Sequence, residues 1–325
     1  MSLHRPFIRL GLALIAFWCA GAGSGAFAAF PEKPARLIVP FAPGGGTDLI
    51  SRALGAGMAQ ALGQPVVIEN KPGAGTVIGM DAVAKGAPDG YTIVMATFAH
   101  AVNPSLLAKM PFANDAAFAP ISLIGRGPNV LAVRAASPFH TVADIVAAAR
   151  AKPGVLTYAS QGNGTSAHLA GEMLDNLARI QMTHVPYRGA GPAMTDVLGG
   201  QVDMIFGTAA AVSPLISAGK LRAIAVTSEA PSPAFKGVPT VGATVPGYAV
   251  ESWYGLYAPA ATPPAVIEIL NAAARAGARA PEFVRKIEQE GLTVIAGSPA
   301  ELEAYVRGEE ARWRKIVTEN KIRLD

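Results

Sequence analysis

Short runs rich in β-branched and apolar residues alternate with helical stretches along almost the whole chain. This alternation is typical of α/β proteins, in which largely parallel strands are connected by helices. The first unit is the clearest. Residues 36–40 (RLIVP) predict a buried strand, 41–46 a glycine loop, and Thr47-Asp48 the start of a helix that reaches about Leu62.

The same patterns predict the other elements. Strands are expected at 66–69, 91–96, 130–133, 156–159, 183–185, 203–206 and 221–226, and helices at 77–84, 141–151, 165–177, 264–276, 282–290 and from 299 onward. Two helix starts are strongly marked. Thr141 and Asp144 have the spacing of a capping box, and Ser298-Pro299-Ala300-Glu301 adds proline at the first helical position.

The first 29 residues have the pattern of a signal peptide. Arg5 and Arg9 precede an apolar run over residues 10–22, and Ala26-Phe27-Ala28 places small residues at a cleavage site. The run is shorter than the roughly 20 residues that span a bilayer. We therefore expect cleavage near Ala28 or Ala29 and export to the periplasm, with a membrane anchor as the weaker alternative.

The remaining chain of about 296 residues is long for a single hydrophobic core, which predicts two lobes. Without Arg5 and Arg9, 25 basic residues face 23 acidic ones, and both kinds are scattered. That balance argues against a nucleic-acid partner. The single cysteine, Cys19, leaves with the signal peptide, and the histidines lack metal-binding spacing, so neither a metal nor another cofactor is expected.

Two glycine loops, residues 43–48 (PGGGTD) and 160–166 (SQGNGTS), each connect a predicted strand to a predicted helix. Glycine allows the backbone to approach a ligand closely, and the first N–H groups of a helix are unpaired donors at its positive end. Each loop alone could be only a tight turn. Two such loops, one in each half of the chain, favour a shared anion site.

Enzyme motifs are missing from this sequence. It contains no GxGxxG or GxxxxGK[ST] phosphate loop and no GxSxG nucleophile elbow. His168 lies three residues after Thr165 and is expected to brace the second loop, with a role as a proton carrier as the alternative. Arg188 follows a predicted strand, where it either contacts a ligand or is an ordinary surface cation.

At these residues the sequence resembles the Bug receptor family, the substrate-binding proteins of tripartite tricarboxylate transporters. The resemblance covers essentially the whole chain after residue 29. It is carried by residues 37–41 (LIVPF) with Gly44, Gly45 and Asp48, by 70–75 (NKPGAG), 88–92 (PDGYT), 103–106 (NPSL), 162–165 (GNGT) with His168, 186–189 (PYRG), 198–203 (LGGQVD) and 253–255 (WYG).

The resemblance implies a type II periplasmic-binding-protein fold, an α/β fold in which crossover strands join two lobes and the ligand cleft lies between them. It places lobe 1 at residues 30–126 and 250–325, and lobe 2 at 127–249, after the signal peptide at 1–29. The crossings are expected near 124–128 and 247–252.

The implied function is that of a receptor, not an enzyme. Such a protein captures a small carboxylate (an organic acid, amino acid or aromatic acid) as a monomer and delivers it to the membrane subunits of a tripartite tricarboxylate transporter. A ligand-sensing co-receptor for a membrane signalling protein fits the same sequence. An exported α/β hydrolase is a more remote alternative, because no nucleophile–base pair is evident.

The resemblance places the ligand-binding positions on the two glycine loops, at residues 41–47 and 160–166, and further candidates lie on segments expected to border the cleft. The candidates are Phe41, Ala42, Pro43, Gly44, Gly45, Thr47 and Asp48; Ser160, Gly162, Asn163, Gly164, Thr165 and Ser166; and Thr97, His100, Tyr187, Arg188 and Thr208. Asp48 is expected to order its loop or to meet an amine on the ligand. Pro43 and Arg188 depart from the alanine and lysine usual in the family, so the resemblance does not identify the acid.

Overall fold

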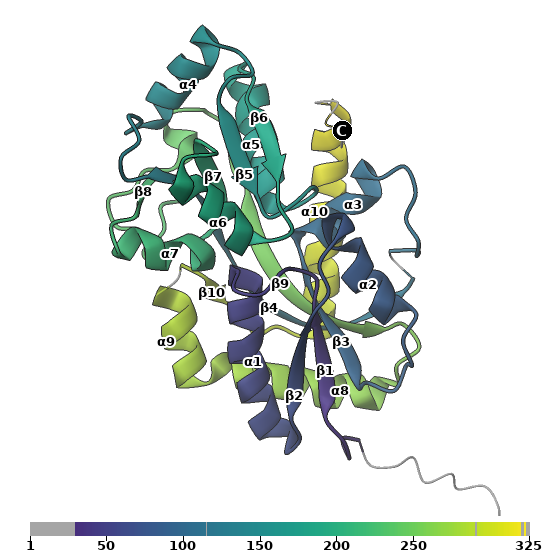
Figure 1. The fold of residues 1–325 in the computed structure, drawn as a ribbon. Coiled ribbons are helices and arrows are strands. Elements are labelled where there is room, and N and C mark those ends of the chain that lie inside the picture. The colour runs from purple at the N-terminus through teal and green to yellow at the C-terminus, as the bar shows by residue number, and fades with distance from the viewer. Residues whose placement is uncertain (1–29, 115, 290, 320–321, 323–325) are drawn as a thin grey trace, which may run out of the picture.

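The computed structural model describes residues 30–114, 116–289, 291–319 and 322. The predicted signal peptide, residues 1–29, lies outside the described residues. The strands form one curled sheet in the order β2-β1-β3-β9-β4-β7-β5-β6, and β8 and β10 also pair with β4. Figure 1 shows two α/β lobes, one above the other, which the long strands β4 and β9 connect.

Lobe 1 forms around a parallel set of three strands. β1 (Ala35–Val39) lies between β2 (Val66–Asn70) and β3 (Thr92–Thr97), and β3 pairs antiparallel with β9 (Glu251–Pro259). The other elements of this lobe are α1 (Gly46–Leu62), η1 (Ala74–Thr76), α2 (Val77–Ala84), α3 (Phe98–Leu106), α8 (Pro264–Arg279), α9 (Pro281–Gln289), β10 (Thr293–Val294) and α10 (Pro299–Glu319).

Lobe 2 repeats the arrangement on a smaller scale. β5 (Thr157–Ser160) lies parallel to β6 (Thr183–Pro186) and β7 (Met204–Thr208), while β8 (Leu221–Val226) pairs antiparallel with β4 (Phe118–Arg134). The helices of this lobe are α4 (Val142–Ala151), α5 (Ser166–Ala178), α6 (Ala190–Gly199) and α7 (Ala209–Ser217), and the return segment contains η2 (Val241–Ala243).

Strand β4 passes from one lobe to the other. It pairs with β9 as far as Pro128, opposite Glu251, and with β7 from Asn129, opposite Thr208. The chain returns to lobe 1 next to this part of β4. Thr227 N donates to Asn129 O at 2.9 Å, and Val250 N, just before β9, donates to Thr227 O at 2.8 Å. The lobe boundaries at 126/127 and 249/250 stay a prediction.

Most predicted elements are present within one to three residues of their expected bounds. Both predicted capping boxes form: Asp144 N donates to Thr141 Oγ1 at 3.1 Å, and Ser298 N donates to Glu301 Oε2 at 2.6 Å. Helix α3 was not expected, since it contains Pro104, which removes a helix hydrogen bond. β4 is 17 residues long, whereas the sequence predicted only residues 130–133. The prediction was too short because prolines and glycines in the first half of the strand obscure the apolar pattern.

The core extends through both lobes. The largest fully buried side chains include Trp253 on β9 and Trp313 on α10, each 0% exposed. Trp313 packs edge-on against Phe98 with ring centroids 4.8 Å apart, which fixes the start of α3. No helix in the described part of the chain is long and apolar enough to cross a membrane.

Candidate functional site

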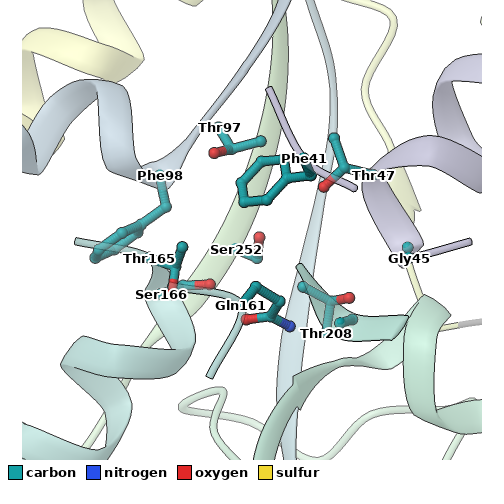
Figure 2. Close-up of a pocket in the computed structure, with 12 residues that line it drawn as sticks. Phe41, Gly45, Thr47, Thr97, Phe98, Gln161, Thr165, Ser166, Thr208 and Ser252 are labelled. Carbon is teal, nitrogen blue, oxygen red and sulfur yellow. The ribbon is translucent and has the colours of Figure 1, made fainter. Parts of the chain in front are cut away.

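Five helices begin at one cavity between the lobes: α1 and α3 of lobe 1, and α5, α6 and α7 of lobe 2. The cavity has an empty volume of about 370 Å³, including its opening to solvent. Figure 2 shows Phe41 and Thr47 on one side of this space and Gln161 and Thr208 on the other. We call this the inner cavity; it is lined by Phe41, Gly45, Gly46, Thr47, Thr97, Phe98, Gln161, Thr165, Ser166, Ala190, Thr208 and Ser252.

The helix starts bring the positive ends of several helix dipoles to the inner cavity, whose described lining contains no cation. At four of the five helices the N-cap residue (Gly45, Thr97, Gly189 or Thr208) makes no side-chain cap hydrogen bond. Their first N–H groups therefore keep the positive end of each helix dipole open to a ligand. None of the twelve described residues that line the cavity is charged. An anion bound there would be held by amides and hydroxyls.

Two buried polar side chains at the inner cavity have unsatisfied atoms. The Thr208 hydroxyl and both amide atoms of Gln161 find no hydrogen-bond partner among the described residues, although the two side chains are only 8% and 7% exposed. Buried polar groups in proteins are nearly always paired. These donors and acceptors are therefore suited to a polar ligand that fills the space between the lobes.

Direct contacts across the cleft hold the lobes in a closed arrangement. Ala42 N of lobe 1 donates to Arg188 O of lobe 2 at 3.0 Å. A Cβ on Gly46 would lie 2.6 Å from Thr208 Oγ1, and one on Gly75 would lie 2.7 Å from Asn163 O. Glycine at these two positions lets the lobes approach this closely.

A second space, which we call the outer chamber, adjoins the inner cavity and shares Phe41 and Gln161 with it. It has an empty volume of about 570 Å³ and is lined by Pro40, Phe41, Gly73, Ala74, Gly75, Thr76, Gln161, Gly162, Asn163, Pro186, Tyr187 and Arg188. Arg188 is the single charged residue among these lining residues, and it is exposed. Gln161 therefore lies between an uncharged inner end and an outer end with one cation.

Asp48 orders the first glycine loop. Its carboxylate accepts hydrogen bonds from Gly44 N, Arg52 Nε and Asn70 Nδ2, each at 3.0 Å. Burial alone would raise the pKa of Asp48, but these hydrogen bonds outweigh it and hold the pKa below its usual value. Asn70 Nδ2 also donates to Phe41 O at 3.0 Å, so the network fixes a residue of the inner cavity.

The second glycine loop uses two of its own amides internally. Gly162 N donates to Ser160 Oγ at 3.1 Å and Gly164 N donates to His168 Nδ1 at 3.3 Å. The predicted bracing role of His168 is thus seen in the structure. Together with the Gly44 bond to Asp48, these contacts mean that three of the predicted glycines shape the loops, while Gly45, Thr165 and Ser166 line the cavity.

The predicted site residues divide into three groups. Phe41, Gly45, Thr47, Thr97, Thr165, Ser166 and Thr208 line the inner cavity, and Gly162, Asn163, Tyr187 and Arg188 line the outer chamber. Ala42, Pro43, Gly44, Asp48, His100, Ser160 and Gly164 line neither. His100 instead packs against Phe118 and Tyr257, and burial lowers its pKa to about 4.

Five residues of the inner cavity are absent from the candidate residues named above: Gly46, Phe98, Gln161, Ala190 and Ser252. Gly46 and Gln161 are inside the glycine loops, so the loop signal already covered them. Ala190 starts a helix directly after a strand and could have been found by the same rule. Ser252 lies on the crossover strand β9, where no local motif marks it. No group of three or more metal-ligating side chains occurs among the residues described.

A curled α/β sheet divided into two lobes, with an uncharged, amide-lined cavity between them, defines a solute-binding protein of the periplasmic type. The model of the tripartite tricarboxylate transporter family receptor matches residues 50–322. This chain belongs to that family. The protein BugT of Bordetella pertussis is 34% identical over 319 residues, which cover 96% of this chain and 98% of BugT.

Three solved structures share the fold over their whole length. The periplasmic binding protein BugD is 32% identical with a TM-score of 0.88, covering 90% of this chain and 99% of its own. Rpa4515 of R. palustris with adipate is 33% identical with a TM-score of 0.86, covering 90% and 99%. MatC from Rhodopseudomonas palustris with bound malate is 31% identical with a TM-score of 0.84, covering 89% and 100%.

Proposed function

We propose that this protein is a periplasmic receptor that binds a small carboxylate in the inner cavity and presents it to the membrane subunits of a tripartite tricarboxylate transporter. The observation that carries the proposal is the meeting of five helix N-termini at a cavity without a charged lining. A carboxylate is a small, planar anion that accepts several N–H and O–H bonds at once. Its charge would be balanced by helix dipoles rather than by a cation.

The two adjoining spaces, which share Phe41 and Gln161, suggest how the ligand is oriented. The carboxylate lies in the inner cavity, and the rest of the molecule passes Gln161 into the outer chamber, toward Arg188. Adipate and malate, which accompany two of the similar structures, are both dicarboxylates. Acids with a second polar group are therefore the first compounds to try, ahead of purely apolar acids.

Ligand binding is tested by thermal-shift screening of the purified protein against organic acids, each beside its uncharged amide. A ligand present at about 100 times its Kd stabilises the folded state by about 2.7 kcal/mol, which raises Tm by several degrees. We expect at least one acid to do so and its amide not to. Thr208→Val should weaken the response to that acid, since it removes a cavity hydroxyl while keeping the side-chain volume. Equal binding of acid and amide would contradict an anion site.

The transport role is tested in cells. Deletion of the gene should abolish uptake of the radiolabelled acid found by the screen, and a plasmid copy should restore it. A sensor of the same fold predicts the other result: uptake continues, while transcription in response to the acid is lost. Export to the periplasm, a monomeric state and the lobe boundaries at 126/127 and 249/250 belong to the same proposal.

A further inference from the structure

Two histidines lie together beneath the second glycine loop. His168 on α5 and His184 on β6 stack with ring centroids 4.2 Å apart and an interplanar angle of 23°. Tyr158 stacks on His184, with centroids 4.9 Å apart. His168 is 3% exposed, and neither histidine lines the inner cavity or the outer chamber. A direct contact with the ligand therefore does not explain this pair.

Each histidine is connected to one glycine amide of the loop. His168 Nδ1 accepts the Gly164 N–H at 3.3 Å. His184 Nε2 lies 2.6 Å from Ser160 Oγ, and that hydroxyl accepts the Gly162 N–H at 3.1 Å. Gly162 has φ of 133° and Gly164 has φ of 75°, conformations that local propensity does not fix. The ring nitrogens thus help to orient two otherwise permissive residues, together with the Thr165 hydroxyl, which donates to Gly162 O at 2.7 Å.

The chemistry of this arrangement requires an uncharged His168. A ring nitrogen accepts a hydrogen bond only when it carries no proton, so the His168 proton lies on Nε2, which is 3.7 Å from Glu172 Oε1. Burial lowers the pKa of His168 to about 4, and burial together with the electrostatic effect of the neighbouring His168 lowers that of His184 to about 3. The other titratable groups around the pair are Glu172, Asp175, Tyr158 and Tyr248.

We propose that His168 and His184 are positioning residues for the ligand site. As a stacked, uncharged pair they hold the amides of Gly164 and Gly162, and so they set the shape of the loop that places Gln161, Thr165 and Ser166 in the inner cavity. The inference rests on the proposed function in one respect, since the affinity for an acid is one of its two readouts. The other readout, the state of the loop itself, needs no ligand.

The two positions require different ring nitrogens, which gives a crossed test. The Oδ1 of asparagine can replace Nδ1, and the terminal amide of glutamine can reach the place of Nε2. His168→Asn should keep the loop and the affinity, while His168→Gln should expose the Gly164 amide and weaken binding roughly tenfold, the cost of about one hydrogen bond. At position 184 the order reverses: His184→Gln should keep both properties, and His184→Asn should lose them.

The matched control lies within each pair, because both variants lose the same ring and the same stacking. Amide hydrogen exchange at Gly162 and Gly164 reports the loop, and calorimetry with the acid that gives the largest thermal shift reports the site. Equal behaviour of Asn and Gln at a position overturns the proposal. So does a crossed exchange pattern without a crossed affinity pattern, because the loop would then not set the site.

A measurement on the unaltered protein removes the dependence on folding of the variants. Nitrogen NMR of the histidine rings at pH 7 should show His168 with a proton on Nε2 and none on Nδ1. A proton on Nδ1 overturns the proposal whatever the variants do. If no acid in the panel binds, the proposed function fails, while the exchange and ring-nitrogen measurements still decide whether the pair holds the loop.

Discussion

The amide of Ala42 donates a hydrogen bond to the carbonyl oxygen of Arg188 at 3.0 Å, across the cleft between the two lobes. Both residues lie in loops that follow strands, β1 in lobe 1 and β6 in lobe 2. The bond uses backbone atoms only, so it depends on the distance between the lobes and not on the arginine side chain. It defines the closed arrangement of the molecule at the edge of the outer chamber.

Ligand binding should make the protein more compact in solution. The inner cavity is complete only when both lobes surround it, so a ligand that contacts both favours the closed state. Small-angle scattering with and without the best acid from the screen should show a smaller radius of gyration in its presence. If the ligand-free protein is open in solution and its radius of gyration does not change at saturating ligand, the result would contradict ligand-induced closure.

Gly189→Ala should hinder closure. Gly189 has φ of 148°, and a Cβ there would lie 3.1 Å from Ala42 N, the donor of the cross-lobe bond. We expect affinity for the acid to fall about tenfold, the cost of roughly one hydrogen bond. Gly154→Ala is the control, because Gly154 also has a positive φ (76°) in lobe 2 but faces open space. Calorimetry on both variants decides the matter, and equal losses would mean that backbone strain alone is responsible.

Gly164→Val and Arg188→Ala separate loop shape from charge. A Cβ on Gly164 would lie 2.3 Å from Asn103 Oδ1 of the other lobe, and φ is 75°, so valine disturbs both the loop and closure. We expect no measurable binding. Arg188 is exposed, and an exposed pair contributes ~1 kcal/mol or less, so its loss should weaken binding less than tenfold. If calorimetry on folded variants finds Arg188→Ala the more damaging, a salt bridge holds the acid.

Asp175→Asn should stabilise the protein at alkaline pH. Burial raises the pKa of Asp175 to about 7, and the nearby Glu172 adds to the effect. The pKa of this carboxyl group is near 4 in the unfolded chain and about 7 in the folded protein. The unfolded chain therefore releases the proton first, and the folded state loses stability as the pH rises from about 4 to about 7. Asparagine keeps the acceptor for Met182 N, which Asp175 Oδ2 meets at 2.8 Å.

Thermal melts should therefore show a smaller difference in Tm between this variant and the parent at pH 5 than at pH 8. At pH 8 the variant should gain about 1 kcal/mol, or roughly 2–4 °C, a figure reduced for partial exposure of the group. A gain of the same size at pH 5 would point to a cause other than ionisation of Asp175.

The exported protein should begin at or just after Ala28 or Ala29. Arg5, Arg9, the apolar run and the small residues at 26–28 are the reasons. Intact-mass measurement of protein from the periplasmic fraction gives the new N-terminus directly. A product that still contains Cys19, with or without a lipid, would show that the segment is retained.

Sequence patterns were enough to predict the fold class and many residues of the candidate site. Strand–glycine-loop–helix units identify parallel α/β structure because backbone geometry and helix capping are local properties, and the order of motifs identified the receptor family. Phe41, Thr47, Thr165 and Ser166 could be placed at the site because they belong to the loops that carry those signals.

What those loops face depends on long-range packing, which no local pattern reveals. Ser252 and Ala190 reach the inner cavity through the pairing of β9 and the position of α6, contacts between segments far apart in the chain. His100, expected at the cleft wall, lines neither the inner cavity nor the outer chamber and packs against Phe118 and Tyr257, which are distant in sequence or on another strand. The amides of Gly162 and Gly164 are already hydrogen-bonded, to Ser160 Oγ and to His168 Nδ1. His168 and His184 come together because α5 packs against β6. Local pattern predicts which backbone groups are free to bind; long-range packing decides which of them are already bound.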